Sequence, residues 1–359
     1  MRPPASELNR YLSESLTAWE SIIIPHMVSR LWHMNADFEV ELAATGGPYR
    51  RPLSSELLNR RLAEHLLWLA SPGDALLIQG PWSERLQSEA RRRDVGLIRP
   101  PGSGEERNRL FTPWGWSPSA VAAGEKACSV VRAPPLDVVA RVNSKLWSHA
   151  LEVELGMALP GAALTRTFDE LREAVARASP GPDDKWVVKS PYGFAARERV
   201  LGRGSVLEEP QAKWARRRLA AGETLIFQPW LDVVREYGVA LEIAPDGSFE
   251  IRGVSDLQTN GAGAATGYVL GRPPDPRRQA ELERVARLVA RRLFDEGYYG
   301  PVGIDALEHA GGLHPLLEIN ARYTMGFVAV AVERSLQPSA PTFWSFRTES
   351  APDAAGKAT

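Results

Sequence analysis

Four polar residues near the carboxyl end of the sequence are of the types that bind a divalent cation and an anion. Asp305 stands alone, whereas Glu318, Asn320 and Arg322 follow one another at intervals of two. Residues two apart in a strand share a face, so these last three side chains are expected to lie together. Carboxylate and amide oxygens favour Mg²⁺ or Mn²⁺ over Zn²⁺, and an arginine beside them suits an anion held by that metal.

A predicted hairpin brings Asp305 to the same place. Two strand-forming runs flank Gly311-Gly312, which is typical of a type I′ turn because both of its central residues need positive φ. With Ala310 opposite Leu313, the register places Asp305 directly opposite Glu318. Like charges opposite one another destabilise a sheet unless a cation lies between them. We therefore expect a metal site, the alternative being an exposed cross-strand pair.

Lys189 ends a strand predicted at residues 185–189 and precedes a loop that contains glycine. A lysine placed there can bind phosphate oxygens together with backbone N–H groups. The alternative is an edge residue whose aliphatic stem lies along apolar surface. The Walker sequence for phosphate binding is absent.

The elements that must position these residues follow a mixed pattern. Residues 1–125 alternate strand-like and helix-like segments, with a strand at 75–79, a helix at 83–93 capped by Ser83, and a strand at 95–98, which predicts a parallel α/β unit. Helices are then predicted at 143–156, from 167, at 208–221 and at 275–296, and strands at 185–189, 224–231, 236–244 and 249–255, with a glycine loop at 259–267. The fold class is α/β, with α+β elements in the carboxyl-terminal part.

Composition bounds the function further. The 359 residues suffice for two or three domains, and 43 Lys+Arg against 44 Asp+Glu give no net field that would favour nucleic acid or a membrane surface. The single cysteine, Cys128, excludes an internal disulfide and is expected in buried packing rather than as a nucleophile. No signal-like or membrane-spanning run occurs, so we expect a cytoplasmic protein. Residues 349–359 are expected to form a flexible tail.

The order of the candidate motifs resembles the ATP-grasp superfamily over about residues 126–332. The motifs are Asn143-Ser-Lys145, Val187-Val-Lys189-Ser-Pro with its glycine loop, Gln228-Pro-Trp-Leu231, Glu236, Asp305 and Glu318-Ile-Asn-Ala-Arg322. The resemblance implies a Rossmann-like pre-ATP-grasp domain at 1–125. A two-lobed ATP-grasp domain then follows, with a small lobe at 126–225 that carries a phosphate-covering loop and a carboxyl-terminal lobe at 226–340 that carries the metal site.

The resemblance also implies roles, with ATP and Mg²⁺ or Mn²⁺ as cofactors. Lys145 and Lys189 are expected to hold the nucleotide phosphates, and Gly193 to begin the covering loop that runs to Arg197. The expected adenine hinge consists of Gln228, Pro229, Trp230 and Leu231, and Glu236 is expected to bind the ribose. The expected metal ligands are Asp305, Glu318 and Asn320. Arg322 is expected to contact the substrate carboxylate or its acyl phosphate. The alternatives are a surface position for Glu236 and a salt bridge from Arg322 to Glu318.

Two departures from the family pattern bear on the substrate. Some peptide-type ligases carry an arginine two residues before the first metal carboxylate, where this chain has Gly303. Arg322, or alternatively Arg252 on the preceding hairpin, is then expected to supply that catalytic charge. The hinge also has Gln228-Pro229 in place of an acidic-basic pair.

The resemblance implies a carboxylate-amine ligase that forms an acyl phosphate from ATP and couples it to an amino acid or peptide amine, releasing ADP and phosphate. The alternatives are a carboxylate-thiol ligase or phosphotransferase with the same nucleotide site, and an ATP-binding regulatory module without catalysis. The expected partners are small-molecule carboxylates and amines, among them peptides, with no nucleic acid and no membrane. Many relatives are dimers, so a homodimer is one expected state.

Overall fold

The computed structural model describes residues 29–44, 49–104, 106–193 and 198–345. The loop residues 194–197 and the tail predicted at 349–359 lie outside the described residues. No helix in the described ranges is both long and apolar enough to cross a membrane.

The amino-terminal unit contains the predicted parallel sheet. Its strands are β1 (Arg30–His33), β2 (Ala75–Leu77), β3 (Gly96–Ile98) and β4 (Leu110–Pro113), in the order β3-β2-β1-β4, and every pair is parallel. The helices of this unit are α2 (Phe38–Ala43), α3 (Leu53–Leu62), α4 (Glu84–Arg92) and α5 (Pro118–Lys126), with 3₁₀ segments η1 (Ala63–Trp68) and η2 (Glu106–Asn108). Ser83 caps α4 as predicted, because its side chain accepts the Leu86 N–H.

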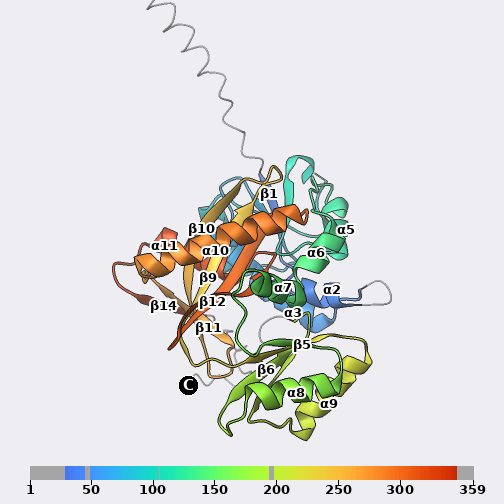
Figure 1. Ribbon diagram of the computed structural model, residues 1–359. Helices are drawn as coiled ribbons and strands as arrows, with labels where there is room; N and C mark the ends of the chain where they lie inside the picture. Colours follow the sequence, from blue (N-terminus) through green and yellow to red (C-terminus); the bar gives the residue numbers. More distant parts are fainter. Residues whose placement is uncertain (1–28, 45–48, 105, 194–197, 346–359) are drawn as a thin grey trace, which may run out of the picture.

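A small lobe is formed by residues 163–229 (Figure 1). Its strands β5 (Ala163–Thr165), β6 (Lys185–Lys189), β7 (Arg199–Arg203) and β8 (Leu225–Pro229) form an antiparallel sheet in the order β5-β8-β6-β7. The helices α8 (Phe168–Ala178) and α9 (Glu209–Ala220) pack on this sheet. The predicted capping box of Thr167 and Glu170 begins α8.

The largest sheet has six strands, all antiparallel, in the order β13-β12-β9-β10-β11-β14. They are β9 (Val233–Ile243), β10 (Phe249–Thr259), β11 (Ala265–Leu270), β12 (Gly300–His309), β13 (Gly312–Asn320) and β14 (Thr342–Ser345). Helix α10 (Pro276–Asp295) packs against the face that carries Val239 and Leu241, and α11 (Met325–Leu336) against the face that carries Ala240.

Several sequence expectations need correction. The helix predicted at 143–156 is α7 (Lys145–Glu154), which begins after Ser144 because that side chain caps it by accepting the Leu146 N–H, and a helix that was not predicted, α6 (Leu136–Val142), precedes it. The predicted glycine loop is shorter, since β10 extends to Thr259 and β11 begins at Ala265. Cys128 is exposed rather than buried.

The hairpin turn also differs from the prediction, although its consequence holds. Strand β12 ends at His309, which pairs with Gly312, so the turn consists of Ala310 and Gly311. Neither residue has the left-handed φ of a type I′ turn. A register shift between Asp305 and Leu307 then restores the predicted pairing of Asp305 with Glu318, which is confirmed.

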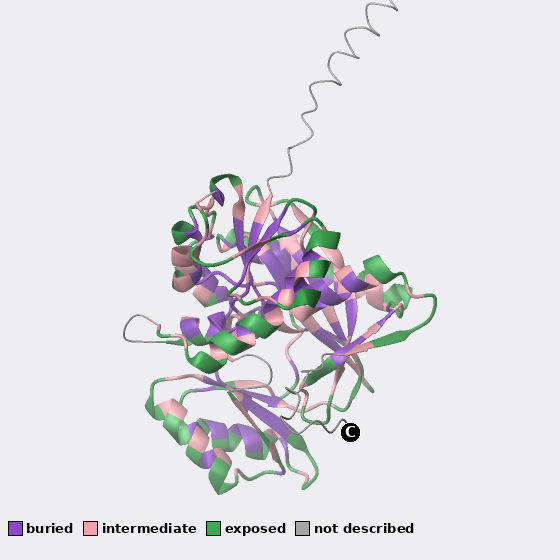
Figure 2. Cartoon of the chain, turned by 180° about the vertical axis from the view of Figure 1, so that it is seen from behind, coloured by how far each residue is buried: buried purple, intermediate pink, exposed green. Residues whose placement is uncertain are grey.

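The buried hydrophobic clusters do not correspond one to one to these three parts of the fold. One buried cluster joins Leu31 and Phe111 of the amino-terminal unit to Leu241 and Val285 of the carboxyl-terminal lobe, whereas the small lobe has a cluster of its own. Figure 2 shows this buried interior running through the large sheets, with the small lobe below.

Candidate nucleotide and metal site

The paired strands β12 and β13 bring the predicted metal ligands together. Asp305 lies opposite Glu318, and Asn320 Nδ2 donates a hydrogen bond to Asp305 Oδ2 at 3.0 Å. Burial and the neighbouring Glu318 carboxylate raise the pKa of Asp305. Burial alone would also raise the pKa of Glu318, but Lys145 and Lys189 outweigh it and the pKa is lowered.

Helix α7 places Lys145 against this cluster. As the first residue of the helix that Ser144 caps, Lys145 donates from Nζ to Glu318 Oε1 at 2.7 Å and to the Gly193 carbonyl at 2.8 Å. It therefore connects the metal-ligand strands to the start of the predicted phosphate-covering loop. Gly193 is the last described residue before that loop.

Strand β6 ends at Lys189, the second predicted phosphate ligand. Burial lowers the pKa of Lys189, Glu318 raises it, and Lys145 lowers it further. Within the described ranges the Lys189 ammonium forms no hydrogen bond or ion pair. It is thus a cation near Glu318 that no described residue neutralises by a direct contact.

The donor set fits a hard divalent cation. The described part of the chain contains no group of three or more His, Cys, Asp or Glu side chains placed to hold a metal ion. The set here is two carboxylates and one amide, all oxygen donors, which suits Mg²⁺. Asp305 makes no ion pair with a described residue, and a cation would supply the charge that its buried carboxylate needs.

Arg322 reaches the cluster but pairs with a residue that the sequence did not indicate. Its Nη2 donates to Asn320 Oδ1 at 2.8 Å, and its Nε donates to Glu39 Oε1 at 2.8 Å. Glu39 belongs to α2 of the amino-terminal unit and is only 3% exposed. The alternative of an Arg322–Glu318 bridge is not what the structure contains. No local pattern could have found Glu39, since 283 positions separate the partners.

The hinge follows β8 into the larger lobe. Gln228 is buried, Pro229 has no N–H, and the Trp230 N–H is already bonded to the Lys185 carbonyl at 2.8 Å. The Leu231 N–H makes no backbone hydrogen bond with a described residue, so it is a backbone donor of the hinge that is available to a ligand.

Glu236 lies on β9 beside the hinge. Its carboxylate accepts a hydrogen bond from the Thr259 hydroxyl, and burial raises its pKa. It also acts electrostatically on Asp305, which places it near the metal-ligand cluster rather than on the open surface.

The two departures noted in the sequence have structural counterparts. A Cβ added to Gly303 would lie 2.5 Å from Thr324 Cγ2, so any side chain there would have to displace Thr324. The structure does not bring Arg252 to the cluster: it pairs with Glu242 at 2.8 Å and with Glu250 at 2.9 Å.

No protein-family model and no curated protein matches this chain. Solved structures do match in fold. A pyruvate carboxylase from Rhizobium etli is similar over 85% of this chain and 27% of its own, with a TM-score of 0.54 and 15% identity. A biotin carboxylase from Campylobacter jejuni is similar over 77% of this chain and 65% of its own, with a TM-score of 0.52 and 12% identity. These are ATP-grasp enzymes. This chain has the ATP-grasp fold.

A third solved structure adds a ligand-bound example of the fold. The biotin carboxylase domain of the 2-oxoglutarate carboxylase from Hydrogenobacter thermophilus, in complex with MgADP, ADP and bicarbonate, covers 77% of this chain and 67% of its own. Its TM-score is 0.51 and its identity is 13%. At these identities the likeness concerns the fold.

Proposed function

We propose that this protein is an ATP-dependent, ADP-forming ligase that activates a carboxylate as an acyl phosphate and couples it to an amine of an amino acid or peptide. The observation that carries the proposal is the cluster of Asp305, Glu318 and Asn320 with two lysines against it. Two facing carboxylates, and a lysine with no direct partner among the described residues, destabilise a fold unless a ligand neutralises them. A magnesium nucleotide accounts for both.

In this proposal the nucleotide lies between the small lobe and the six-stranded sheet. The Leu231 N–H contacts the adenine, Glu236 the ribose, and Lys145 and Lys189 the phosphates. Asp305, Glu318 and Asn320 hold Mg²⁺, which neutralises charge on the phosphate oxygens when it is bound. Lys145 joins Glu318 to Gly193, so a nucleotide that contacts Lys145 would lie close to both residues.

The chemistry proceeds in two displacements. A substrate carboxylate oriented by Arg322 attacks the γ-phosphorus of ATP, the bond from that phosphorus to the bridging oxygen breaks, and ADP leaves. The amine then attacks the acyl carbon, and the bond between that carbon and the phosphate oxygen breaks, so that phosphate leaves. The nitrogen loses a proton and an amide remains. Lys189 offsets the negative charge that develops on the transferred group, and no side-chain nucleophile is needed.

The test is turnover with defined acceptors. Purified protein is incubated with ATP, Mg²⁺ and pools of amino acids and short peptides, and ADP release is measured together with the mass of any new amide. Glu318→Gln and Asp305→Asn should each abolish turnover and leave the fold intact, whereas Glu281→Gln on the exposed face of α10 should not change it. Near-native turnover in both site variants would contradict the metal assignment.

The same assay separates the alternatives. ADP release with a thioester or a phosphorylated product would favour the thiol ligase or the phosphotransferase. ATP binding without ADP release for any acceptor would favour a binding module. Arg322→Ala should still bind ATP but lose the carboxylate substrate, and loss of ATP binding would move Arg322 into the nucleotide site.

A further inference from the structure

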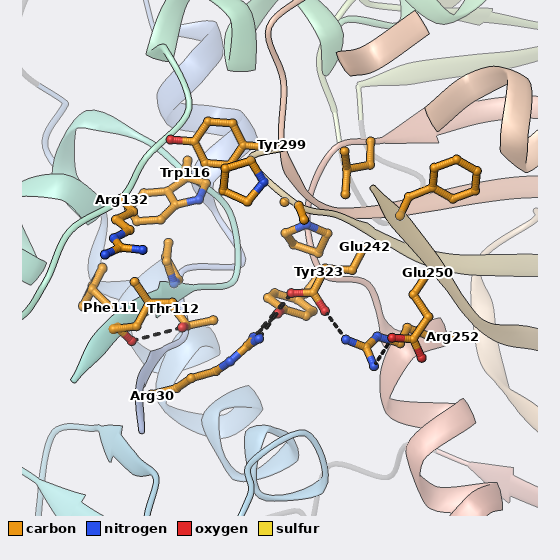
Figure 3. Close-up of a pocket in the computed structure, with 18 of the residues that line it drawn as sticks. Arg30, Phe111, Thr112, Trp116, Arg132, Glu242, Glu250, Arg252, Tyr299 and Tyr323 are labelled. Carbon is orange, nitrogen blue, oxygen red and sulfur yellow. Dashed lines mark hydrogen bonds and ion pairs between the residues drawn. The ribbon is translucent and has the colours of Figure 1, made fainter. Parts of the chain in front are cut away.

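A second pocket lies where the amino-terminal sheet meets the far end of the six-stranded sheet (Figure 3). Its volume is about 480 Å³, within the range of about 300–1,000 Å³ that small-molecule sites occupy. Arg30, Trp116, Arg132 and strand β4 line one side, and Glu242, Arg252, Tyr299 and Tyr323 line the other. Pockets between two packed units are frequent ligand sites.

This pocket is separate from the proposed nucleotide site. On β9, Glu242 of the pocket pairs with Pro301, and Gly238 pairs with Asp305 of the proposed metal site. Glu242 and Gly238 are four positions apart, so about 13 Å of strand separates the pocket from the proposed metal site. None of the candidate ATP or metal ligands lines the pocket. Tyr323 is the pocket residue closest in sequence to the proposed metal ligands. Its ring packs against Trp32 and Phe327, so it belongs to the hydrophobic packing beside the pocket.

The pocket has an excess of positive charge. Glu242 accepts from Arg252 at 2.8 Å and from Arg30 at 3.4 Å, and Glu250 pairs with Arg252 at 2.9 Å. The two glutamates are therefore occupied by two arginines. Arg132, the third arginine, is exposed and forms no hydrogen bond or ion pair with any residue in the described ranges. Its guanidinium has five donors and suits a carboxylate, which it can bind through two parallel hydrogen bonds.

Aromatic side chains form part of the remaining lining, beside aliphatic residues and prolines. Phe111 and Trp116, from the amino-terminal unit, are almost fully buried, whereas Phe249 and Tyr299, from the carboxyl-terminal lobe, are partly exposed. Tyr299 is fixed, because its hydroxyl donates to the Ala133 carbonyl at 2.7 Å, one residue from Arg132. Fixed aromatic surfaces bind a flat apolar group with little loss of side-chain freedom.

We infer that this pocket binds a small organic carboxylate with a flat apolar body, whose carboxylate pairs with Arg132 and whose body lies against the aromatic walls. The geometry assigns this ligand to a site of its own, and the assignment does not depend on the proposed ligase activity.

The test compares a charged probe with its uncharged isostere. Phenylacetate and phenylacetamide are titrated into the full chain by calorimetry, and phenylacetate should bind at least about tenfold more tightly because its charge gains the hydrogen bonds of Arg132. Arg132→Gln should weaken the binding of phenylacetate to the affinity of phenylacetamide. Arg132→Lys should restore part of the difference in affinity between the two probes. Arg107→Gln, which removes another exposed arginine of the same unit outside the pocket, should have no effect.

Three binding results would overturn the inference, and displacement by MgATP would be a fourth. The first three are the absence of phenylacetate binding at millimolar concentration, equal binding of acid and amide, and unchanged binding in a folded Arg132→Gln variant. Saturating MgATP should leave the phenylacetate affinity unchanged, as should Lys189→Met. Competitive displacement by MgATP would assign the pocket to the nucleotide site instead.

Discussion

Arg322 shows how strongly the site depends on a contact between distant residues. Its guanidinium lies between the Asn320 oxygen and the buried Glu39 carboxylate, so it is neutralised from the amino-terminal unit while it contacts one of the proposed metal ligands. A substrate carboxylate at Arg322 would therefore share the guanidinium with Glu39. This pair also ties α2 to the end of β13, and its loss should affect stability as well as turnover.

We predict that Glu39→Gln lowers the free energy of unfolding by about 3 kcal/mol, because it leaves the Arg322 cation nearly buried without a carboxylate. Urea denaturation followed by fluorescence measures the change. The double variant Glu39→Gln/Arg322→Gln should lose clearly less than the sum of the single variants, since the unpaired charge is removed. Additive losses would mean that the two residues do not interact.

A second residue-scale prediction concerns pH. Burial, with His309 and Lys189 nearby, lowers the pKa of His314 from 6.5 to about 4. The unfolded chain then binds a proton between these values and the folded chain does not, so the contribution of His314 to stability is present above pH 6.5 and is lost as the pH falls towards 4. Because His314→Gln has no group that titrates there, its free energy of unfolding should fall by up to about 3 kcal/mol less than that of the unsubstituted protein between pH 6.5 and 4.

Urea denaturation of the unsubstituted protein and of His314→Gln at pH 7.5, 6.0 and 4.5 tests this prediction. His33 has the same lowered pKa, also from burial, so the variant should keep part of the pH dependence. Parallel stability profiles for the two proteins would show that His314 is not buried in its neutral form.

At the scale of elements, the hairpin shows what the sequence can and cannot predict. The alternation of side chains correctly predicted two strands and a shared face for Glu318 and Asn320. The turn was placed one residue late, and the shift between Asp305 and Leu307 offsets that error. The shifted segment contains Pro315, which cannot donate a ladder hydrogen bond, so a proline inside the strand was the available signal for the irregularity.

Other elements show the same limit. Caps with local chemistry, such as Ser83 and Thr167, were predicted because the residues that form them are near in sequence. The pairing of Arg252 with Glu242 and that of Arg322 with Glu39 depend on how whole elements pack, and no local pattern encodes them.

The corrected turn makes a prediction of its own. Gly312 has φ +127°, and a Cβ added there would meet no atom within 4 Å, so Gly312→Ala should cost about 1–3 kcal/mol through backbone strain alone. Gly261 is equally open but has no such φ, and Gly261→Ala should be neutral or slightly stabilising. Urea denaturation of the pair measures the difference. Equal effects in the two variants would contradict the turn geometry.

At the scale of the whole molecule, packing groups the amino-terminal unit with the carboxyl-terminal lobe. Residues of both belong to one buried cluster, which includes Leu31 and Leu241, whereas the small lobe packs around Trp186 and Phe227. A lobe with its own core can open without disturbing the rest, since a structure opens in units that have few contacts across their boundary. Such independence would suit the proposed admission and release of a nucleotide.

We therefore predict that Phe227→Ala, which removes a fully buried ring, destabilises residues 163–229 by about 3–5 kcal/mol and leaves the larger body protected. Leu241→Ala, also fully buried, should instead loosen the amino-terminal unit and the six-stranded sheet together. Hydrogen exchange read by mass spectrometry distinguishes the two patterns. MgATP should raise protection of the small lobe, because Lys189 of β6 and Lys145 of α7 would then hold one ligand from both sides. Faster exchange throughout the molecule in Phe227→Ala would show that the small lobe does not open by itself.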